Sequence, residues 1–352
     1  MKKGNIITRL SIAALLLSAP ATFAQDIHFS QFDMQPLVVN PAFTGMFYGK
    51  IRANAIYRNQ WKSVTTPYVT YGASVDMPIK TESNGDYLAG GLQLYKDQAG
   101  DGNLSNFTGL VSIAYHKTFG GKSGDDYSGS DLAVGLQAGY AQKSIDLSKL
   151  YFGDEFVNGS FVKGSTQEYH LGMGNSVNYY IVNAGLCFSQ AVNQNFSYTL
   201  GLAANNLNQP NEALQKKQNS DVGLAMRYTG ELGMVINMND KLSLRPAVLF
   251  QTQASAAELI YGNEFHYSLT DQYGDVNFTP AIFVGGWMRG GDAAMITAGI
   301  EIKNMRIGLG YDYNTSSLNN ASNGNGGFEI ALKYISPYSY SHSRRSIPCP
   351  RF

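Results

Sequence analysis

The chain has 352 residues, only 15% of them charged, and its 26 basic residues balance its 26 acidic residues. This balance favours neither nucleic acid nor an acidic substrate as a partner. Tyrosine, phenylalanine and glycine are abundant instead, with 23, 18 and 38 residues. Such a composition is poor in charge for a soluble surface and is typical of strands that meet a membrane interface, with a soluble β-sandwich as the alternative.

The first 24 residues have the three parts of a secretory signal peptide. Basic residues come first, a short apolar stretch follows over residues 10–19, and the small residues Thr22 and Ala24 end it. The apolar stretch falls short of the roughly 20 residues that a membrane-spanning helix needs. We therefore expect cleavage after Ala24 and an exported, slightly acidic mature chain that begins at Gln25.

Residues 25–49 follow the signal and show no regular alternation of apolar and polar residues. Pro36, Pro41 and Gly45 favour fixed turns over a strand. We interpret this segment as a periplasmic lead-in that caps the rim of the domain after it, because chain ends must be tied down. A plug or a docking surface is the alternative interpretation.

From residue 50 onward, apolar residues alternate with small or polar ones, as in strands with one lipid-facing side. Leu132 and Val134 share one face, for example, and Ala133 and Gln137 share the other. The pattern predicts strands near residues 50–61, 67–78, 87–97, 104–119, 130–143, 176–190, 194–206, 226–238, 241–253, 256–266, 277–289, 293–303, 305–314 and 325–336.

The mature chain has no run of 18 apolar residues, so a membrane protein of this sequence would cross the bilayer with strands that close into a barrel. We therefore predict an all-β fold, a transmembrane antiparallel outer-membrane β-barrel of about 14 strands, over residues 50–336.

Long and short connections alternate along these strands. Residues 144–175, 207–225 and 315–324 form long loops after odd-numbered strands, whereas turns such as residues 239–240 follow even-numbered ones. Outer-membrane barrels have short periplasmic turns and longer outer loops. We therefore expect both termini in the periplasm, with residues 337–352 as a C-terminal periplasmic tail.

Ten charged residues fall on the face that we assign to the lumen. They are Arg52, Arg58, Asp76, Glu231, Arg245, Glu301, Arg306, Asp312, Glu329 and Lys333. A charge that faces lipid is costly, whereas one that faces the lumen can be solvated or paired. Because both signs are present, we favour mutual pairs that fill the barrel over a lining that selects a solute.

The sequence carries no motif of a hydrolase, a phosphate-binding loop or a zinc protease. Asp97, Asp101 and Asn103 resemble part of a calcium loop, but the positions that need a carboxylate hold other residues, so we interpret them as a polar hairpin turn. Cys187 and Cys349 form no metal-binding pair, and whether they are joined stays open. We expect no enzyme activity, no cofactor and no metal.

Several blocks near the two ends of the chain are distinctive. They are QDIHFSQFD at residues 25–33, NPAFTG at 40–45, YRNQW at 57–61, TYGASVD at 70–76, GYDYNTS at 310–316, GFEIALKY at 327–334 and PCPRF at 348–352. In this order they resemble the PorP/SprF family of the type IX secretion and gliding machinery of Bacteroidetes. The resemblance covers nearly the whole mature chain and implies an outer-membrane barrel without catalytic residues.

The resemblance also implies a role beside one secreted, adhesin-like cell-surface protein, which the barrel would help to leave the cell or to stay attached. Outer-membrane lipid and periplasmic components of the secretion machinery are the other expected partners, and nucleic acid is not one. Candidate partner-binding residues within the blocks are Asn40, Pro41, Phe43, Gly45, Arg58 and Trp61. The alternative function, which the barrel alone suggests, is a passive channel or small-solute transporter.

Overall fold

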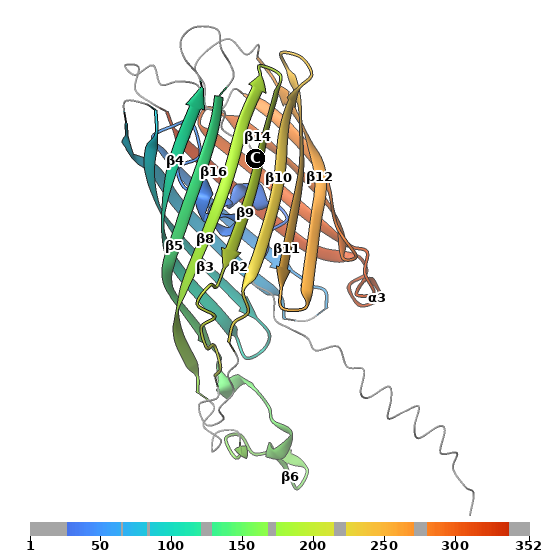
Figure 1. The fold of residues 1–352 in the computed structure, drawn as a ribbon. Helices are drawn as coiled ribbons and strands as arrows, with labels where there is room; N and C mark the ends of the chain where they lie inside the picture. The colour runs from blue at the N-terminus through green and yellow to red at the C-terminus, as the bar shows by residue number, and fades with distance from the viewer. Residues whose placement is uncertain are drawn as a thin grey trace, which may run out of the picture.

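Fourteen antiparallel strands close into one barrel in the computed structural model (Figure 1). The structure describes residues 27–64, 66–82, 85–120, 129–167, 174–214, 223–270 and 280–337. The barrel strands are β1 (Ile51–Gln60), β2 (Tyr68–Thr81), β3 (Tyr87–Ala99), β4 (Leu104–Gly120), β5 (Gly129–Ser144), β8 (Ser176–Asn193), β9 (Phe196–Asn205), β10 (Arg227–Asn237), β11 (Leu242–Gln253), β12 (Ala256–Ser268), β13 (Ala281–Arg289), β14 (Ala293–Ile302), β15 (Met305–Asn314) and β16 (Asn325–Ser336). β1 pairs with β16 and closes the ring. The predicted fold class and strand number are confirmed.

Side chains alternate between the lumen and the outer wall, because successive residues of a strand point to opposite faces. On β5, Leu132 and Val134 are exposed on the outside, whereas Ala133 and Gln137 are buried inside. In a membrane-spanning barrel this apolar outer belt faces lipid and needs no cover from protein.

β12 is the strand whose sequence alternates least clearly. Glu258 and Glu264 interrupt its apolar pattern, yet both belong to the inward-facing set with Ile260 and His266. Asn263 lies on the outer set. The strand therefore keeps its alternation, with two carboxylates on the side where a charge can be paired.

The long connection after β5 folds outside the barrel. It contains the short 3-10 helices η3 (Leu147–Lys149) and η4 (Gly153–Glu155), followed by a small hairpin of β6 (Phe156–Val157) and β7 (Ser160–Phe161). Figure 1 shows it at the end of the barrel that also carries the helix α3 (Asn319–Ser322). The sequence pattern did not predict this hairpin. None of the helices in the described ranges is long and apolar enough to span a membrane.

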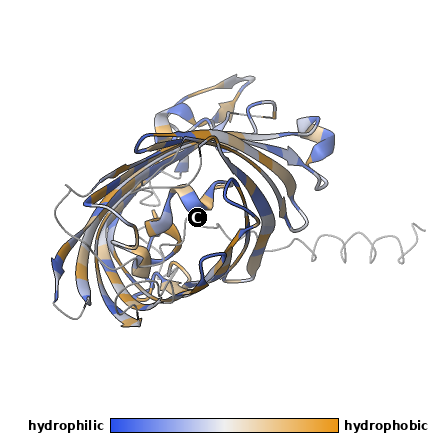
Figure 2. Ribbon diagram, turned by 90° about the horizontal axis from the view of Figure 1, so that it is seen from above, coloured by the Kyte–Doolittle hydropathy of each residue, from blue (hydrophilic) through white to orange (hydrophobic). Residues whose placement is uncertain are grey.

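Residues 27–47 lie inside the barrel, where Figure 2 shows their short helices within the ring of strands. These helices are η1 (Phe32–Met34), α2 (Pro36–Val39) and η2 (Pro41–Phe43). Both prolines stand at helix starts, where their missing N–H costs nothing. We expected a cap at the rim; the structure instead packs the segment within the lumen, which corresponds to the alternative of a plug. We call residues 27–47 the plug.

The plug runs the length of the barrel. β1 begins beside the last residue of β16, where Ile51 pairs with Ser336, and we call this the Ile51 end. Ile27 and His28 lie near Arg227 and Glu258, at the opposite end, which we call the Gln60 end. The described chain therefore begins at the Gln60 end and finishes with residue 337 at the Ile51 end, because the plug carries it through the lumen. That both termini lie in the periplasm stays a prediction.

Candidate functional site

An apolar cluster anchors the middle of the plug to the barrel wall. Phe32, Val39, Phe43 and Met46 are buried against inward-facing residues of several strands. Phe32 also packs edge-on against Trp287 on β13, with ring centroids 5.5 Å apart. The sequence of this segment has no regular apolar period, because the barrel wall surrounds the segment on all sides.

Asn40 holds the plug against β8, β9 and β10. Its Nδ2 donates to the carbonyl oxygen of Leu186 at 3.0 Å and to Oε1 of Glu231 at 3.0 Å, while its Oδ1 accepts the Ala42 N–H at 2.9 Å. A Cβ on Gly185 would lie 2.0 Å from the Asn40 Oδ1, so glycine leaves the space that this side chain occupies. Hydrogen bonds and the close fit against Gly185 thus both hold the Asn40 side chain in place.

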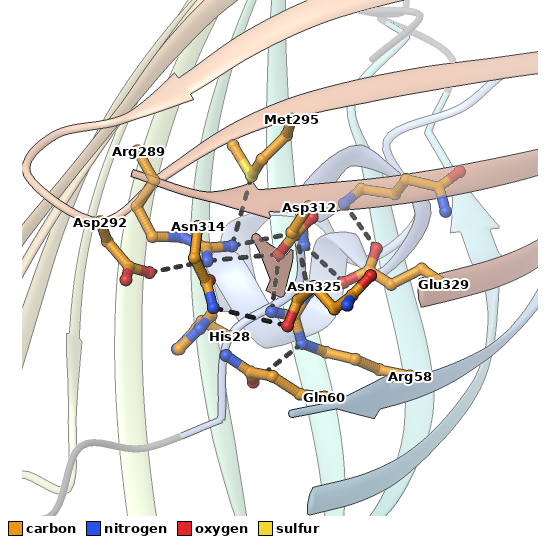
Figure 3. Close-up of polar contacts among 12 residues, drawn as sticks. His28, Arg58, Gln60, Arg289, Asp292, Met295, Asp312, Asn314, Asn325 and Glu329 are labelled. Carbon is orange, nitrogen blue, oxygen red and sulfur yellow. Dashed lines mark hydrogen bonds and ion pairs between the residues drawn. The ribbon is translucent and has the colours of Figure 1, made fainter. Parts of the chain in front are cut away.

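Charged residues tie the first part of the plug to the Gln60 end (Figure 3). Asp312 accepts a hydrogen bond from Arg58 Nη2 at 2.8 Å, and Arg289 Nη1 lies 3.3 Å from the same oxygen. Arg58 also pairs with Glu329. Ser30 of the plug donates to Asp312 at 2.7 Å, and its backbone N–H donates to Glu329 at 2.7 Å. The buried carboxylates of Asp312 and Glu329 therefore bind Ser30 of the plug as well as the arginines of the barrel wall.

A second cluster lies on β11, β12, β14 and β15. Arg306 contacts both Glu264 and Glu301 at 2.6 Å, and Glu301 also lies 3.0 Å from His266 Nε2. The plug joins this cluster through Asp33, whose carboxylate lies 3.5 Å from Arg306 Nη2. Charges of opposite sign therefore fill this part of the lumen together.

A third cluster fixes the last part of the plug. Arg52 pairs with Asp76 at 2.7 Å and donates to the Phe43 carbonyl oxygen at 2.8 Å, and Asp76 accepts the Gly45 N–H at 2.7 Å. His116 Nε2 lies 2.8 Å from the Thr44 carbonyl oxygen. The wall thus satisfies the carbonyl groups of Phe43 and Thr44 and the N–H of Gly45, as buried polar groups require.

Nine of the ten lumen residues selected from the sequence are buried, and the tenth, Glu231, is partly buried and bonded to Asn40. Their contacts are mutual pairs or bonds to the plug, such as Lys333 Nζ donating to the Asp33 carbonyl oxygen at 2.9 Å. Arg289, Glu258 and Glu264 belong to the same clusters and were missed. Their side chains also face the lumen. Arg289, however, lies at the end of β13, and Glu258 and Glu264 lie on β12, the strand with the least regular alternation.

The six partner-binding candidates lie mostly inside the barrel. Asn40, Pro41, Phe43, Gly45 and Arg58 are buried by the plug and its contacts. Trp61 lies at the Gln60 end with a positive φ of 56° and packs edge-on against Tyr68 at 5.2 Å. With the plug in place, the five buried residues present no surface to another protein.

Potential metal and thiol sites are few. Within the described ranges, no group of three or more His, Cys, Asp or Glu side chains could hold a metal ion. The polar segment around Asp101 forms the turn between β3 and β4, where Gly100 and Asn103 have positive φ. Cys187 is a buried free thiol, and Cys349 lies outside the described residues.

The connection after β5 exposes large apolar side chains away from the barrel. Tyr151, Phe156 and Phe161 are 63%, 55% and 51% exposed, and the ring of Phe161 lies 5.2 Å from that of Tyr151 and 5.0 Å from that of Phe156. Glu155 of the same loop is buried, and its carboxylate accepts the N–H groups of Phe152 and Gly164 at 3.1 and 2.7 Å. We call residues 147–164 the aromatic loop; its hydrogen bonds give it a defined shape.

Comparison with known proteins identifies a family. A family model described as "Type IX secretion system membrane protein PorP/SprF" matches residues 21–334. Among curated protein sequences, none matches the chain.

Similar solved structures are outer-membrane barrels at about one-tenth identity. The toluene transporter TbuX of Ralstonia pickettii is 10% identical, with 87% of this chain and 93% of that chain covered and a TM-score of 0.43. The monoaromatic hydrocarbon channel CymD is 10% identical, with 91% and 96% covered and a TM-score of 0.45. CdiB from Escherichia coli is 10% identical, with 81% and 63% covered and a TM-score of 0.45. These likenesses concern the barrel fold alone.

Proposed function

Because the chain belongs to the type IX secretion system membrane protein family PorP/SprF, we propose that it assists the export or surface attachment of one adhesin-like cell-surface protein. It does so as a non-enzymatic component of the outer membrane, alongside periplasmic components of the secretion and gliding machinery. The observation that carries this proposal is the plug, which occupies the lumen along its length.

The plug argues against the lumen as the path of a large substrate. Its release would expose the apolar cluster around Phe32 and Phe43 and would remove Ser30 from the carboxylates of Asp312 and Glu329. A buried polar group that loses its partner costs about 1–3 kcal/mol, and more if it is charged. A barrel closed in this way acts through its ends.

The aromatic loop is the surface that we assign to the secreted partner. Exposed apolar patches on a shaped loop mark protein interaction sites, and Tyr151, Phe156 and Phe161 form such a patch at the Gln60 end. Long outer loops are typical of barrels, so we place this end at the cell surface. The Ile51 end, where β16 finishes, then faces the periplasmic components of the machinery.

Deletion of the gene tests the role. We expect one or a few large surface proteins to stay unexported or to be released, with the rest of the surface proteome intact, and the wild-type gene to restore them. A deletion strain with an unchanged surface proteome would contradict the proposal.

A loop variant tests the assigned surface. We expect the triple substitution Tyr151→Ser, Phe156→Ser and Phe161→Ser to leave barrel insertion normal but to abolish co-purification of the surface protein. The matched control is Asn319→Ser with Asn320→Ser in α3, at the same end of the barrel. Equal retention of the surface protein by both variants would move its binding site elsewhere.

Conductance in a planar bilayer tests the alternative of a passive channel. The plugged wild-type protein should stay closed, and removal of residues 27–47 should open a pore. A steady open pore in the wild-type protein would favour solute transport instead.

A further inference from the structure

The outer wall carries a groove across β16, β1, β2 and β3, with a volume of about 500 Å³. Its floor is made of small side chains that lie side by side, because Ala55 pairs with Ala73 in the register of β1 and β2. Leu332 and Leu94 are the next paired residues on either side and form its walls. All four are exposed on the lipid-facing set of their strands.

A polar and aromatic row closes the groove toward the Gln60 end. Tyr57 pairs with Tyr71, Tyr71 with Lys96, and Lys96 with Phe107, so the four residues lie in one line across four strands. The rings of Tyr57 and Tyr71 contact each other at 5.3 Å. Aromatic residues at this height are typical of the boundary between hydrocarbon and headgroups.

Lys96 is the unusual member of this row. Its side chain is exposed on the outer wall, and it forms no ion pair with any residue in the described ranges. Two other exposed lysines of these strands have acidic partners: Lys117 on β4 lies 3.4 Å from Asp86, and Lys80 on β2 lies 2.8 Å from Glu82. A cation at the edge of the bilayer favours an anionic headgroup, because the lipid then supplies the missing counter-charge.

We propose that this groove binds an anionic membrane lipid, with one acyl chain over Ala55 and Ala73 and its phosphate at Lys96. The two tyrosine rings flank the headgroup. The apolar floor holds the acyl chain, and the ammonium group of Lys96 binds the phosphate. The site thus has one part for each part of the lipid.

A second outer groove provides an internal comparison. It lies over β8, β9, β10 and β11, has a volume of about 470 Å³, and is lined by leucines such as Leu200 and Leu202. No basic residue lines it, and its acidic member is Glu231. Apolar volume alone is therefore common to both grooves, and only the Lys96 groove offers a charge that selects an anion.

Native mass spectrometry of the full-length protein from mixed micelles tests the site. The probes are phosphatidylglycerol and phosphatidylcholine with the same acyl chains. We expect the wild-type protein to retain the anionic lipid roughly fivefold more than the neutral one, the preference that a single interfacial lysine supports. Lys96→Gln should abolish this preference, and Lys96→Arg should keep it.

Groove filling separates the acyl-chain part from the charge. Ala73→Leu should reduce retention of both lipids, whereas Gly230→Leu in the second groove and Lys117→Gln should leave the preference unchanged. Circular dichroism confirms that each variant keeps its strands. Equal retention of both lipids by the wild type, or an unchanged preference in Lys96→Gln, would overturn the site. A dimer that Ala73→Leu abolishes would overturn it too, because a second copy would then occupy the groove.

Discussion

Arg58 joins the two strands beside the ring closure, β15 and β16, to the plug. It pairs with Asp312 and Glu329, and it donates to Ser30 Oγ at 2.7 Å. All of these groups are buried, so none can turn to water when a partner is lost. The sequence placed Arg58 in the lumen by parity but could not name its partners, because they come from the other side of the ring closure and from the plug.

Replacement of Arg58 by alanine should destabilise the protein by about 3–5 kcal/mol, because the buried carboxylate of Glu329 loses its arginine and that of Asp312 keeps Arg289. Guanidinium unfolding of the refolded barrel in bilayers measures the loss. Lys303→Ala, at an exposed turn, is the matched control and should change stability by less than about 0.5 kcal/mol. Equal losses in the two variants would show that the Arg58 pairs do not hold the fold.

His28 should make the first part of the plug sensitive to acid. His28 is partly buried at the Gln60 end; desolvation of its ring holds its pKa well below the ordinary value, and the positive charges of Arg289, Arg58 and Arg227 lower it further. A released plug would regain an ordinary pKa of about 6.5. Below that pH, His28 binds a proton more readily in the released plug than in the docked plug, so acid favours release. Above that pH, His28 is neutral in both forms, and its titration no longer opposes docking.

Hydrogen exchange over residues 29–34 measures this effect, after correction for the intrinsic rate. Opening in the wild type should increase between pH 7 and pH 5, and the increase should be smaller in His28→Gln. Glu258, whose carboxylate lies 3.8 Å from His28, is replaced by glutamine in a separate variant to account for its own titration. An identical pH response in wild type and His28→Gln would exclude this residue as the cause.

At the scale of elements, the strands and the plug differ in what their sequences reveal. Each strand shows a period of two, because one face meets lipid and the other the lumen, and so β5 and even β12 were predicted close to their observed bounds. The plug has no such period, since the wall surrounds it. Its packing depends on glycines such as Gly135 and Gly185, whose inward position has meaning only once the barrel is closed.

Gly135→Ala should displace the middle of the plug while the barrel stays closed. A Cβ at this position would lie 2.3 Å from the backbone N of Ala42 and 2.5 Å from the carbonyl oxygen of Pro41, and backbone atoms cannot turn aside as a side chain can. Overpacking of this kind costs about 1–3 kcal/mol. Hydrogen exchange should rise over residues 36–44.

Gly286→Ala is the control for this substitution, because a Cβ there has no neighbour within 4 Å. It should leave exchange in the plug at the wild-type level. If Gly135→Ala also left it there, the close contact between β5 and Pro41 would not be what seats the plug.

At the scale of the whole molecule, the plug distinguishes transport through the lumen from binding at the ends of the barrel. A channel must move its plug for each transported molecule, whereas a barrel that acts through its ends can keep the plug in place. Thr44 Oγ1 and Ser112 Oγ lie 2.9 Å apart, on the plug and on β4, so cysteines at these positions would place two sulfur atoms close enough to join.

We expect Thr44→Cys with Ser112→Cys, in a chain whose Cys187 and Cys349 are replaced by serine, to lock the plug and still support export of the surface protein. Each single cysteine variant in the same background is a control for the substitutions themselves. Surface proteomics with and without a reductant measures export. A block that appears only in the double variant, and that the reductant relieves, would mean that the plug must leave the lumen and that the partner or a solute passes through it.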